Sequence, residues 1–449
     1  MNSLAKSLLP VVILLASVLP AMPIPRNNPN AYTGTDSDRI EQALSFACAN
    51  AMPLVITPRV PVGNDRRAHW LIDRAILLPG GTEVLLEDCT IQLSDQCRDN
   101  FFRSANCGLG IENPLPIGNI HIRGVGDCVL EGADHPRATG DSSKFIACPC
   151  PKNFSGSPNP TFNDFHRHSY GTDGGKEGES ENGDWRNIGI LMANVHHLSI
   201  ENIRIVEQHA WAISLENCSF GHLNHIEFKA CMTRVIDGAE QNVENQDGIN
   251  LRNGCHDVII SDITGTTGDD VVALTCIASN LHPYVGGGLH TTHVMSNDYT
   301  NREKGIYNVI IRNVLASPAG GCCMVRLLAT DGAEIRNVVI DGIVDTSPAD
   351  FHSWCSILVG ERTGLVGEPG YPYGTVSEEC LFDISISNII SNAKSAVFIP
   401  GGLVDSSISN VSNRYKQGKT LDCRAPQLMK GVLLSNIHYH EGETAPDIQ

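Results

Sequence analysis

The chain has 449 residues, of which 41% are hydrophobic, so it is long enough to bury a large core. Its 50 acidic residues outnumber 32 lysines and arginines, which gives a formal net charge of −18. This negative charge argues against nucleic acids and anionic membranes as partners, because binding to either needs clustered cations. An anionic small-molecule or polymer substrate remains compatible, since a few arginines can dominate the potential of one cleft.

The first 21 residues have the order of a secretory signal. Lys6 precedes an apolar run from Leu8 to Leu19, and small residues follow near Ala21. An anchor helix is the alternative, but the run is short and is interrupted by proline. We therefore expect residues 1–21 to be a signal peptide and the protein to be secreted or periplasmic, with no later membrane span.

One local pattern recurs through most of the chain: a short β-branched strand, a polar residue, and another short strand. Ile386, Ile408 and Leu434 occupy equivalent positions in three copies, separated by 22 and 26 residues. A supersecondary unit repeated at intervals in the twenties is typical of a solenoid. The fold class predicted is all-β, a single-stranded right-handed parallel β-helix with stacked apolar rows and asparagine ladders at its turns. Copies of the pattern begin near Asn119, His196, His256, Tyr307, Ile335, Leu381, Val404 and Lys430.

The predicted β-helix domain covers residues 22–449 and is closed at its N-terminal end by a helix beginning at Asp36. Ile40, Ala43, Leu44 and Ala47 of that segment have helical spacing. Three segments lack the strand pattern and are expected to be long insertion loops, which are often functional in compact domains. They lie near residues 134–187, 279–304 and 351–379.

Acidic residues are spaced at about the length of one coil. Asp269 and Asp270 follow Asp247 by 22 and 23 residues. In a β-helix these carboxylates stack on adjacent coils, and like charges so close raise the pKa of one group. A protonated acid beside ionised carboxylates is what glycoside hydrolysis requires. Each aspartate could instead be an ordinary turn residue.

The same residues resemble a known family. The segment Asn245-Gln246-Asp247-Gly248 resembles the NTDG motif of glycoside hydrolase family 28, the polygalacturonase group, and 268–274 (GDDVVAL) resembles its second acidic motif. Residues 209–215 resemble a motif of the preceding coil, and 325–332 (VRLLATDG) resemble the family's RIKT segment. The resemblance extends over roughly residues 36–440 and implies the pectin-lyase-like form of the β-helix.

The resemblance implies an inverting hydrolysis, and we expect no metal and no cofactor at the site. Asp269 would be the general acid, while Asp247 and Asp270 would hold and deprotonate the attacking water. Arg326 would bind a substrate carboxylate or hydroxyl groups through its planar guanidinium. Asn245, in the first motif, is a further candidate for substrate binding.

Two departures from the family pattern concern the substrate. Leu328 stands where the family has a lysine that meets a uronate, and the family's GHG motif is absent. His290 or His293 is the candidate replacement for the GHG histidine, although either could be a solvent-exposed loop residue.

Further substrate-binding candidates come from the long loop near residues 134–187. Trp211 is expected to pack in the core rather than against a sugar. These loop candidates are Lys176, Trp185 and Arg186.

Two other functions remain open: a calcium-dependent polysaccharide lyase with calcium held by the three aspartates, and a non-catalytic glycan-binding β-helix. The expected partner in every case is a polysaccharide or oligosaccharide, and we expect a monomer.

Sixteen cysteines are present, without a zinc-type spacing. Cys97 with Cys107, and Cys148 with Cys150, are local candidates for disulfides, and burial as free thiols is the alternative.

Overall fold

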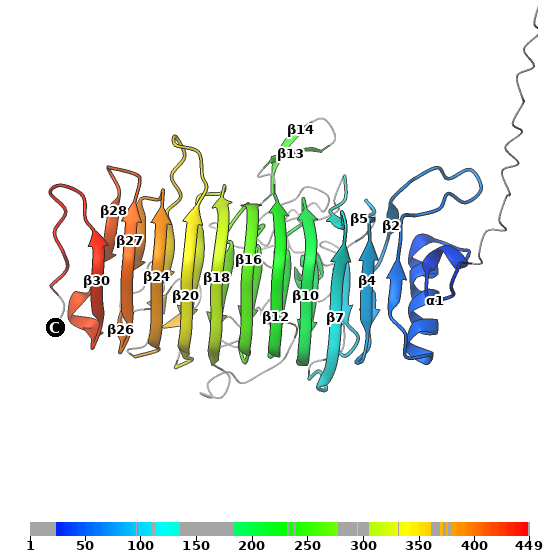
Figure 1. Ribbon diagram of the computed structural model, residues 1–449, viewed down its shortest axis with the longest axis horizontal. Helices are drawn as coiled ribbons and strands as arrows, with labels where there is room; N and C mark the ends of the chain where they lie inside the picture. Colours follow the sequence, from blue (N-terminus) through cyan, green and yellow to red (C-terminus); the bar gives the residue numbers. More distant parts are fainter. Residues whose placement is uncertain are drawn as a thin grey trace, which may run out of the picture.

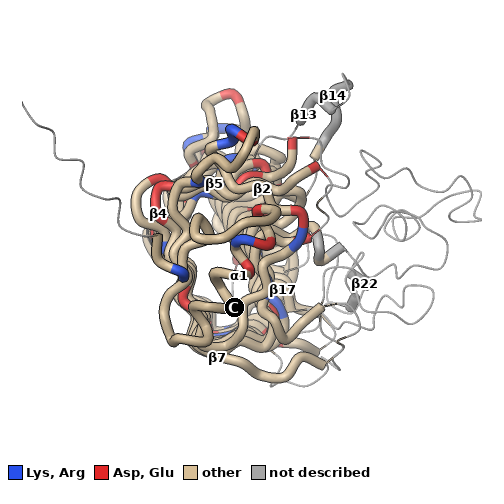
Figure 2. The backbone as a smooth tube through the Cα atoms, turned by 90° about the vertical axis from the view of Figure 1, so that its right-hand side faces the viewer, with Lys and Arg blue, Asp and Glu red and all other residues tan. Residues whose placement is uncertain are grey.

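The computed structural model describes residues 24–447 with several gaps. The gaps are residues 96, 98, 109–110, 112, 135–183, 231–232, 237–238, 244, 277–293, 295–304, 331, 361–368, 371–373 and 376–378. Within these limits the chain winds into a right-handed parallel β-helix, as predicted (Figure 1). Seen end on, the coils superpose into one cross-section (Figure 2).

Two long parallel sheets form the walls of the solenoid. In the described part of the chain the larger sheet has sixteen strands. These are β1 (Leu54–Ile56), β2 (Trp70–Ile72), β4 (Glu83–Glu87), β5 (Thr90–Leu93), β7 (Ile117–Val125), β8 (Val129–Glu131), β10 (Val195–Val206), β12 (Ser219–Lys229), β16 (His256–Thr267), β18 (Ile306–Pro318), β20 (Ile335–Asp345), β24 (Leu381–Ser391), β26 (Leu403–Val404), β27 (Ser407–Asn413), β29 (Met429–Lys430) and β30 (Leu433–His438).

The second wall has ten strands in the same described region, and it carries the candidate site. They are β3 (Ile76–Leu78), β6 (Phe102–Ser104), β9 (Ile190–Ala193), β11 (Ile213–Glu216), β15 (Ile249–Arg252), β17 (Val272–Cys276), β19 (Cys323–Ala329), β21 (Cys355–Val359), β25 (Ser395–Ile399) and β28 (Lys419–Cys423). Smaller elements of the described chain lie outside these two sheets. They are two antiparallel pairs, β13 (Thr233–Ile236) with β14 (Ala239–Asn242) and β22 (Pro369–Gly370) with β23 (Gly374–Thr375), and the short helices η1 (Pro29–Ala31), η2 (Asp184–Asn187) and η4 (Pro426–Leu428).

The predicted stacking of equivalent residues is confirmed by strand register. Ile386 pairs with Ile408, and Ile408 pairs with Leu434. Ile260 pairs with Ile311, so the longer interval between them is one coil carrying a loop. Side chains alternate in and out along each strand, so such rows form a continuous apolar core inside the tube.

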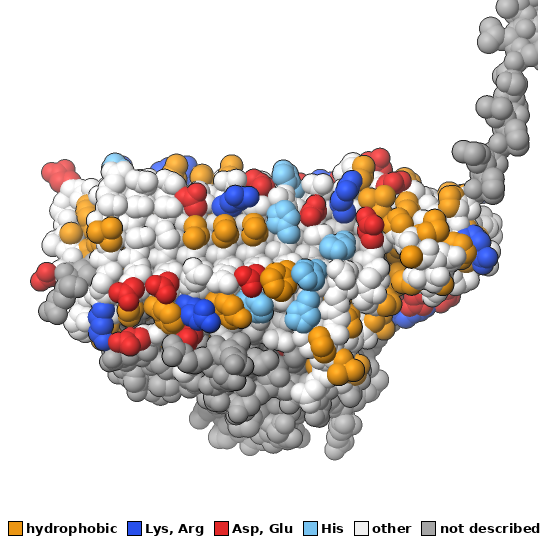
Figure 3. Space-filling model, turned by 60° about the horizontal axis from the view of Figure 1, so that its bottom comes forward, with side chains coloured by type: hydrophobic (Ala, Val, Ile, Leu, Met, Phe, Trp, Pro, Cys, Tyr) orange, Lys and Arg blue, Asp and Glu red, His pale blue; other side chains and the backbone are white. Residues whose placement is uncertain are grey.

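The turns and the outer surface carry ladders of their own. The predicted asparagine ladder is present, with Nδ2 of Asn436 donating to Oδ1 of Asn410 at 2.7 Å and Nδ2 of Asn410 donating to Oδ1 of Asn388 at 3.0 Å. These residues have positive φ, a conformation that asparagine tolerates better than most residues. Histidine side chains gather on one face of the molecule (Figure 3). His256 of β16 stacks on Tyr307 of β18 with ring centroids 4.7 Å apart.

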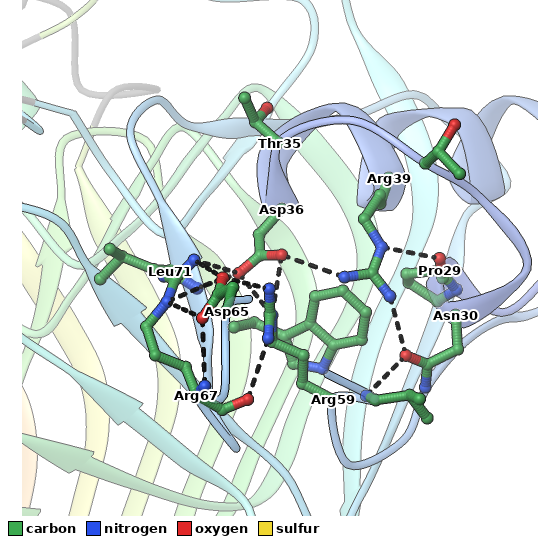
Figure 4. A network of polar contacts seen from close by, with 12 residues as sticks. Pro29, Asn30, Thr35, Asp36, Arg39, Arg59, Asp65, Arg67 and Leu71 are labelled. Atoms are coloured by element: carbon green, nitrogen blue, oxygen red, sulfur yellow. Dashed lines mark hydrogen bonds and ion pairs between the residues drawn. The ribbon is translucent and has the colours of Figure 1, made fainter. Parts of the chain in front are cut away.

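The predicted cap is helix α1 (Asp36–Ala49), which covers the N-terminal end of the core (Figure 1). Thr35 and Asp38 form a capping box at its first turn, and the predicted apolar positions are buried. At the first turn of the helix, Asp36 accepts hydrogen bonds from Nε of Arg59 at 2.9 Å (Figure 4). The guanidinium of Arg39, also in the helix, lies over the ring of Trp70.

Some boundaries and pairings need correction. The third expected insertion, residues 351–379, contains β21, which pairs with β19 and β25 and so belongs to a coil. Cys97 and Cys107 are both free, buried thiols, so of the two alternatives the candidate local disulfide is not formed; Cys148 and Cys150 lie outside the described residues. No helix in the described part of the chain has the length and apolar character to cross a membrane.

Candidate active site

Asp247 and Asp270 lie one coil apart at equivalent positions of the ten-stranded sheet. In the strands that follow them, Ile249 pairs with Val272. The backbone N–H of Gly248 donates to the carbonyl oxygen of Asp270 at 2.9 Å. The interval of 23 residues is therefore one complete coil, and two carboxylates remote in sequence become neighbours.

Asp247 is held by residues of its own coil and of the coil before. Nδ2 of Asn250 donates to its Oδ2 at 3.1 Å, and Nε2 of Gln208 donates to its carbonyl oxygen at 3.3 Å. Gln246 returns a hydrogen bond from its Nε2 to the carbonyl oxygen of Gln208 at 2.8 Å. Only 5% of Asp247 is exposed, and these bonds hold its backbone through Gln208 and its carboxylate through Asn250.

Asp270 is held from the following coil. The N–H of Cys323 donates to its Oδ1 at 2.9 Å, and Nη1 of Arg326 lies 3.5 Å from its Oδ2. Arg326 pairs in register with Ala273, whose methyl side chain occupies little of the space between the two coils. The structure therefore brings Arg326 to Asp270, on the coil next to it.

Asp269 is the partly buried member of the group. Its Oδ1 accepts the N–H of Asp270 at 2.9 Å. Burial, and next the charge of Asp270, raise the pKa of Asp269 to about 6; the Cys322 thiol and Arg326 oppose this rise. Asp269 can therefore hold a proton close to neutral pH.

The residue that the next coil places against Asp269 is Cys322. Its Sγ and carboxylate oxygens of Asp269 and Asp270 all lie within 4.8 Å of one another. Burial, followed by the charges of Asp269, Asp270 and, less strongly, Asp247, raises the pKa of the Cys322 thiol far above its usual range. The Cys322 sulfur therefore lies beside the carboxylates of Asp269 and Asp270, and the backbone bond from Gly248 to Asp270 brings the coil of Asp247 alongside.

This donor set does not fit the calcium site of the lyase alternative. Calcium prefers six to eight oxygen ligands. Here a thiol lies among the carboxylates, the guanidinium of Arg326 faces Oδ2 of Asp270, and a backbone N–H occupies Oδ1. A guanidinium at this position repels a cation.

The remaining predicted site residues have different outcomes. Trp185 was expected to contact substrate, but only 3% of it is exposed and its ring packs under Arg103 in an apolar cluster that includes Trp211. The packing role expected of Trp211 is confirmed. Asn245 lies at the turn before Asp247 with φ of 54°. Arg186 lies in η2 without a described side chain, and Lys176, His290 and His293 lie outside the described residues.

Sequence reasoning missed Cys322, Asn250 and the Gln208–Gln246 pair. Gln246 and Asn250 flank Asp247 in sequence, so proximity alone could have suggested them. Cys322 could not be found by spacing, because the segment 277–304 separates β17 from the next coil and breaks the regular interval.

Comparisons with known proteins give a structural likeness only. No protein-family model matches the sequence, and neither does any curated protein. A family 28 exopolygalacturonase of Yersinia enterocolitica has 13% identity and a TM-score of 0.45, over 91% of this chain and 77% of that chain. A hyperthermoactive exopolygalacturonase of Thermotoga maritima has 13% identity and a TM-score of 0.45, over 91% of each chain.

A polygalacturonase of Erwinia carotovora subspecies carotovora has 12% identity and a TM-score of 0.41, over 92% of this chain and 95% of that chain. Likenesses at this level leave the chemistry of the present chain to be argued from its own site.

Proposed function

We propose that this chain is a secreted glycoside hydrolase that cleaves a polysaccharide or oligosaccharide, pectin-like or related, by inversion. The observation that carries the proposal is that three aspartates lie on two hydrogen-bonded coils just before paired strands, where burial raises the pKa of Asp269 to about 6. Two carboxyl groups whose environments separate their pKa values are the usual means of supplying an acid and a base together.

Asp269 is the general acid in this mechanism. Its raised pKa keeps a proton available for the glycosidic oxygen, and the bond from the anomeric carbon to that oxygen breaks as the proton is delivered. The buried carboxylates of Asp247 and Asp270 orient the attacking water and take its proton. Asn250 and the N–H of Cys323 hold these two carboxylates in place while the water reacts.

Arg326 orients the substrate beside Asp269 and Asp270. Its side chain is 20% exposed, so the guanidinium can reach a ligand while it faces Asp270. A planar fork of donors suits a sugar carboxylate or two hydroxyl groups. Leu328 stands at the position of the lysine in the family pattern, so recognition of a uronate at this site would depend on Arg326.

The test is a glycan panel with the wild-type protein, Asp269→Asn and Asp247→Asn. We expect new reducing ends from wild type, inversion of the anomeric configuration by NMR, and a loss of roughly 10²–10⁴-fold in turnover for Asp269→Asn. Asp262→Asn is the matched control, because Asp262 lies on β16 of the sixteen-stranded sheet and accepts a hydrogen bond from Nδ2 of Asn313.

Other outcomes would assign the chain elsewhere. An unsaturated, ultraviolet-absorbing product that disappears on chelation would indicate a lyase. Glycan binding without turnover, unchanged in Asp269→Asn, would indicate a binding protein.

A further inference from the structure

Cys322 has a position unlike that of most cysteines in the described structure. Most are buried in the core, whereas Cys322 is partly exposed beside Asp269 and Asp270. Its neighbour Cys323 donates a backbone hydrogen bond to Asp270, which fixes this turn against the aspartates. The Sγ of Cys322 is within 4.8 Å of carboxylate oxygens of Asp269 and Asp270.

The surroundings of Cys322 keep its sulfur protonated. Burial and three nearby carboxylates raise the pKa of the thiol, so the thiolate is scarce at neutral pH. A protonated thiol is a poor nucleophile and a poor metal ligand, and what it can offer to a carboxylate is a hydrogen bond. Two carboxylates, those of Asp269 and Asp270, have oxygens within 4.8 Å of its Sγ, and the Asp269 charge has the larger effect on the thiol pKa, while the thiol in turn lowers the pKa of Asp269.

The geometry points to Cys322 as a positioning residue for Asp269, with its S–H donating to the carboxylate that supplies the catalytic proton. This inference rests on the proposed function, in which Asp269 is the general acid. The hydrogen bond strengthens when Asp269 gives up its proton, because bonds to a charged acceptor are stronger than bonds to a neutral one. Cys322 therefore stabilises the carboxylate left by proton transfer and fixes its direction.

The first test does not depend on activity. If the Cys322 thiol faces the Asp269 charge, Asp269→Asn removes that charge and lowers the pKa of the thiol. Iodoacetamide should then alkylate Cys322 several-fold faster at mildly alkaline pH in Asp269→Asn than in wild type, as measured on digested peptides by mass spectrometry. Cys423 is the internal control, because it is also partly buried but lies on β28, and its rate should not change. Equal Cys322 rates in two folded proteins would overturn the inference.

The second test uses the pH profile. Cys322→Ala removes a bond that favours ionised Asp269, so the alkaline limb of activity should move upward by roughly 0.4–1 pH unit, the equivalent of one ordinary hydrogen bond. Cys322→Ser keeps a donor and should restore the wild-type limb, and Cys423→Ala should leave it unmoved. A purely structural role would lower activity without moving the limb.

A failure of the proposed function can be distinguished from a failure of the role assigned to Cys322. If the wild-type protein cleaves no glycan, the proposed function fails while the alkylation rates still report the contact of Cys322 with Asp269. If wild type is active and the limb of Cys322→Ala does not move, only the role assigned to Cys322 fails. Should Cys322→Ala not fold, the alkylation experiment decides alone.

Discussion

The backbone N–H of Gly248 donates to the carbonyl oxygen of Asp270, and this bond is one of several that join the two coils that carry the acidic residues. The coils approach closely there because residue 248 has no side chain. A Cβ at this position would lie 2.4 Å from the carbonyl oxygen of Val271 and 2.8 Å from Cε2 of Phe228. The spacing of the aspartates therefore depends on a glycine beside one of them.

Gly248→Ala should consequently destabilise the protein by about 1–3 kcal/mol, the usual cost of overpacking, and lower turnover because the carboxylates are displaced. Urea denaturation and initial rates measure the two effects. Gly221→Ala is the matched control, since a Cβ there would approach Val258 no closer than 3.4 Å. Equal stability of the two variants would contradict the close approach at Gly248.

Activity should depend on pH through Asp269. Its pKa is raised from 3.8 to about 6, and the general acid must be protonated, so turnover should fall as pH rises through about 6. The measurement is the pH profile of kcat/KM, which reports groups of the free enzyme, and a limb at the ordinary carboxyl pKa would contradict the assignment.

The free energy of unfolding should also depend on pH through Asp269, and it should fall as the pH rises. Because the folded state binds this proton more tightly than the unfolded state, the free energy of unfolding should decrease between about pH 4 and pH 6 and level off above. Asp269→Asn should abolish that contribution, as measured by urea denaturation across the range. Asp262→Asn should retain it, and identical curves for Asp269→Asn and wild type would count against the burial of Asp269.

Arg326 is expected to act through both its shape and its charge. Arg326→Lys keeps the charge but loses the planar fork of donors, so kcat/KM should fall about tenfold or more. The alkaline limb of its pH profile should stay at the wild-type pH. Arg326→Ala also removes a charge that lowers the pKa of Asp269, so its limb should move to higher pH. Arg336→Lys, over Tyr307 on the other sheet, is the control and should behave as wild type. A limb unmoved in Arg326→Ala would show that this charge does not reach Asp269.

The N-terminal cap should depend on Asp36. Its carboxylate is 2% exposed and faces Arg59 at 2.9 Å and Arg39 at 3.2 Å, and it also accepts the N–H of Leu71 at 3.0 Å (Figure 4). Asp36→Ala leaves two buried guanidinium groups without this carboxylate and should cost about 3–5 kcal/mol of unfolding free energy.

The comparison variant for the cap is Asp127→Ala. Asp127 pairs with Arg204 but is 73% exposed, so its loss should cost at most about 1 kcal/mol. Denaturant midpoints of the two variants measure the contrast. If Asp36→Ala were as stable as Asp127→Ala, the buried network would contribute nothing to the closure of the solenoid.

The sequence by itself determined the strands, the interval of one coil at Asp247 and Asp270, and the capping helix. These features depend on local patterns, namely alternation of apolar residues, turn residues at the strand ends and helical spacing after Thr35, and each can be read within one or two coils. Only the tertiary structure decided that Cys322 meets Asp269, that β21 belongs to a coil, and that Trp185 is buried. The physical reason is that insertions between coils change the sequence interval without changing the register of the backbone hydrogen bonds, and register alone sets which side chains touch.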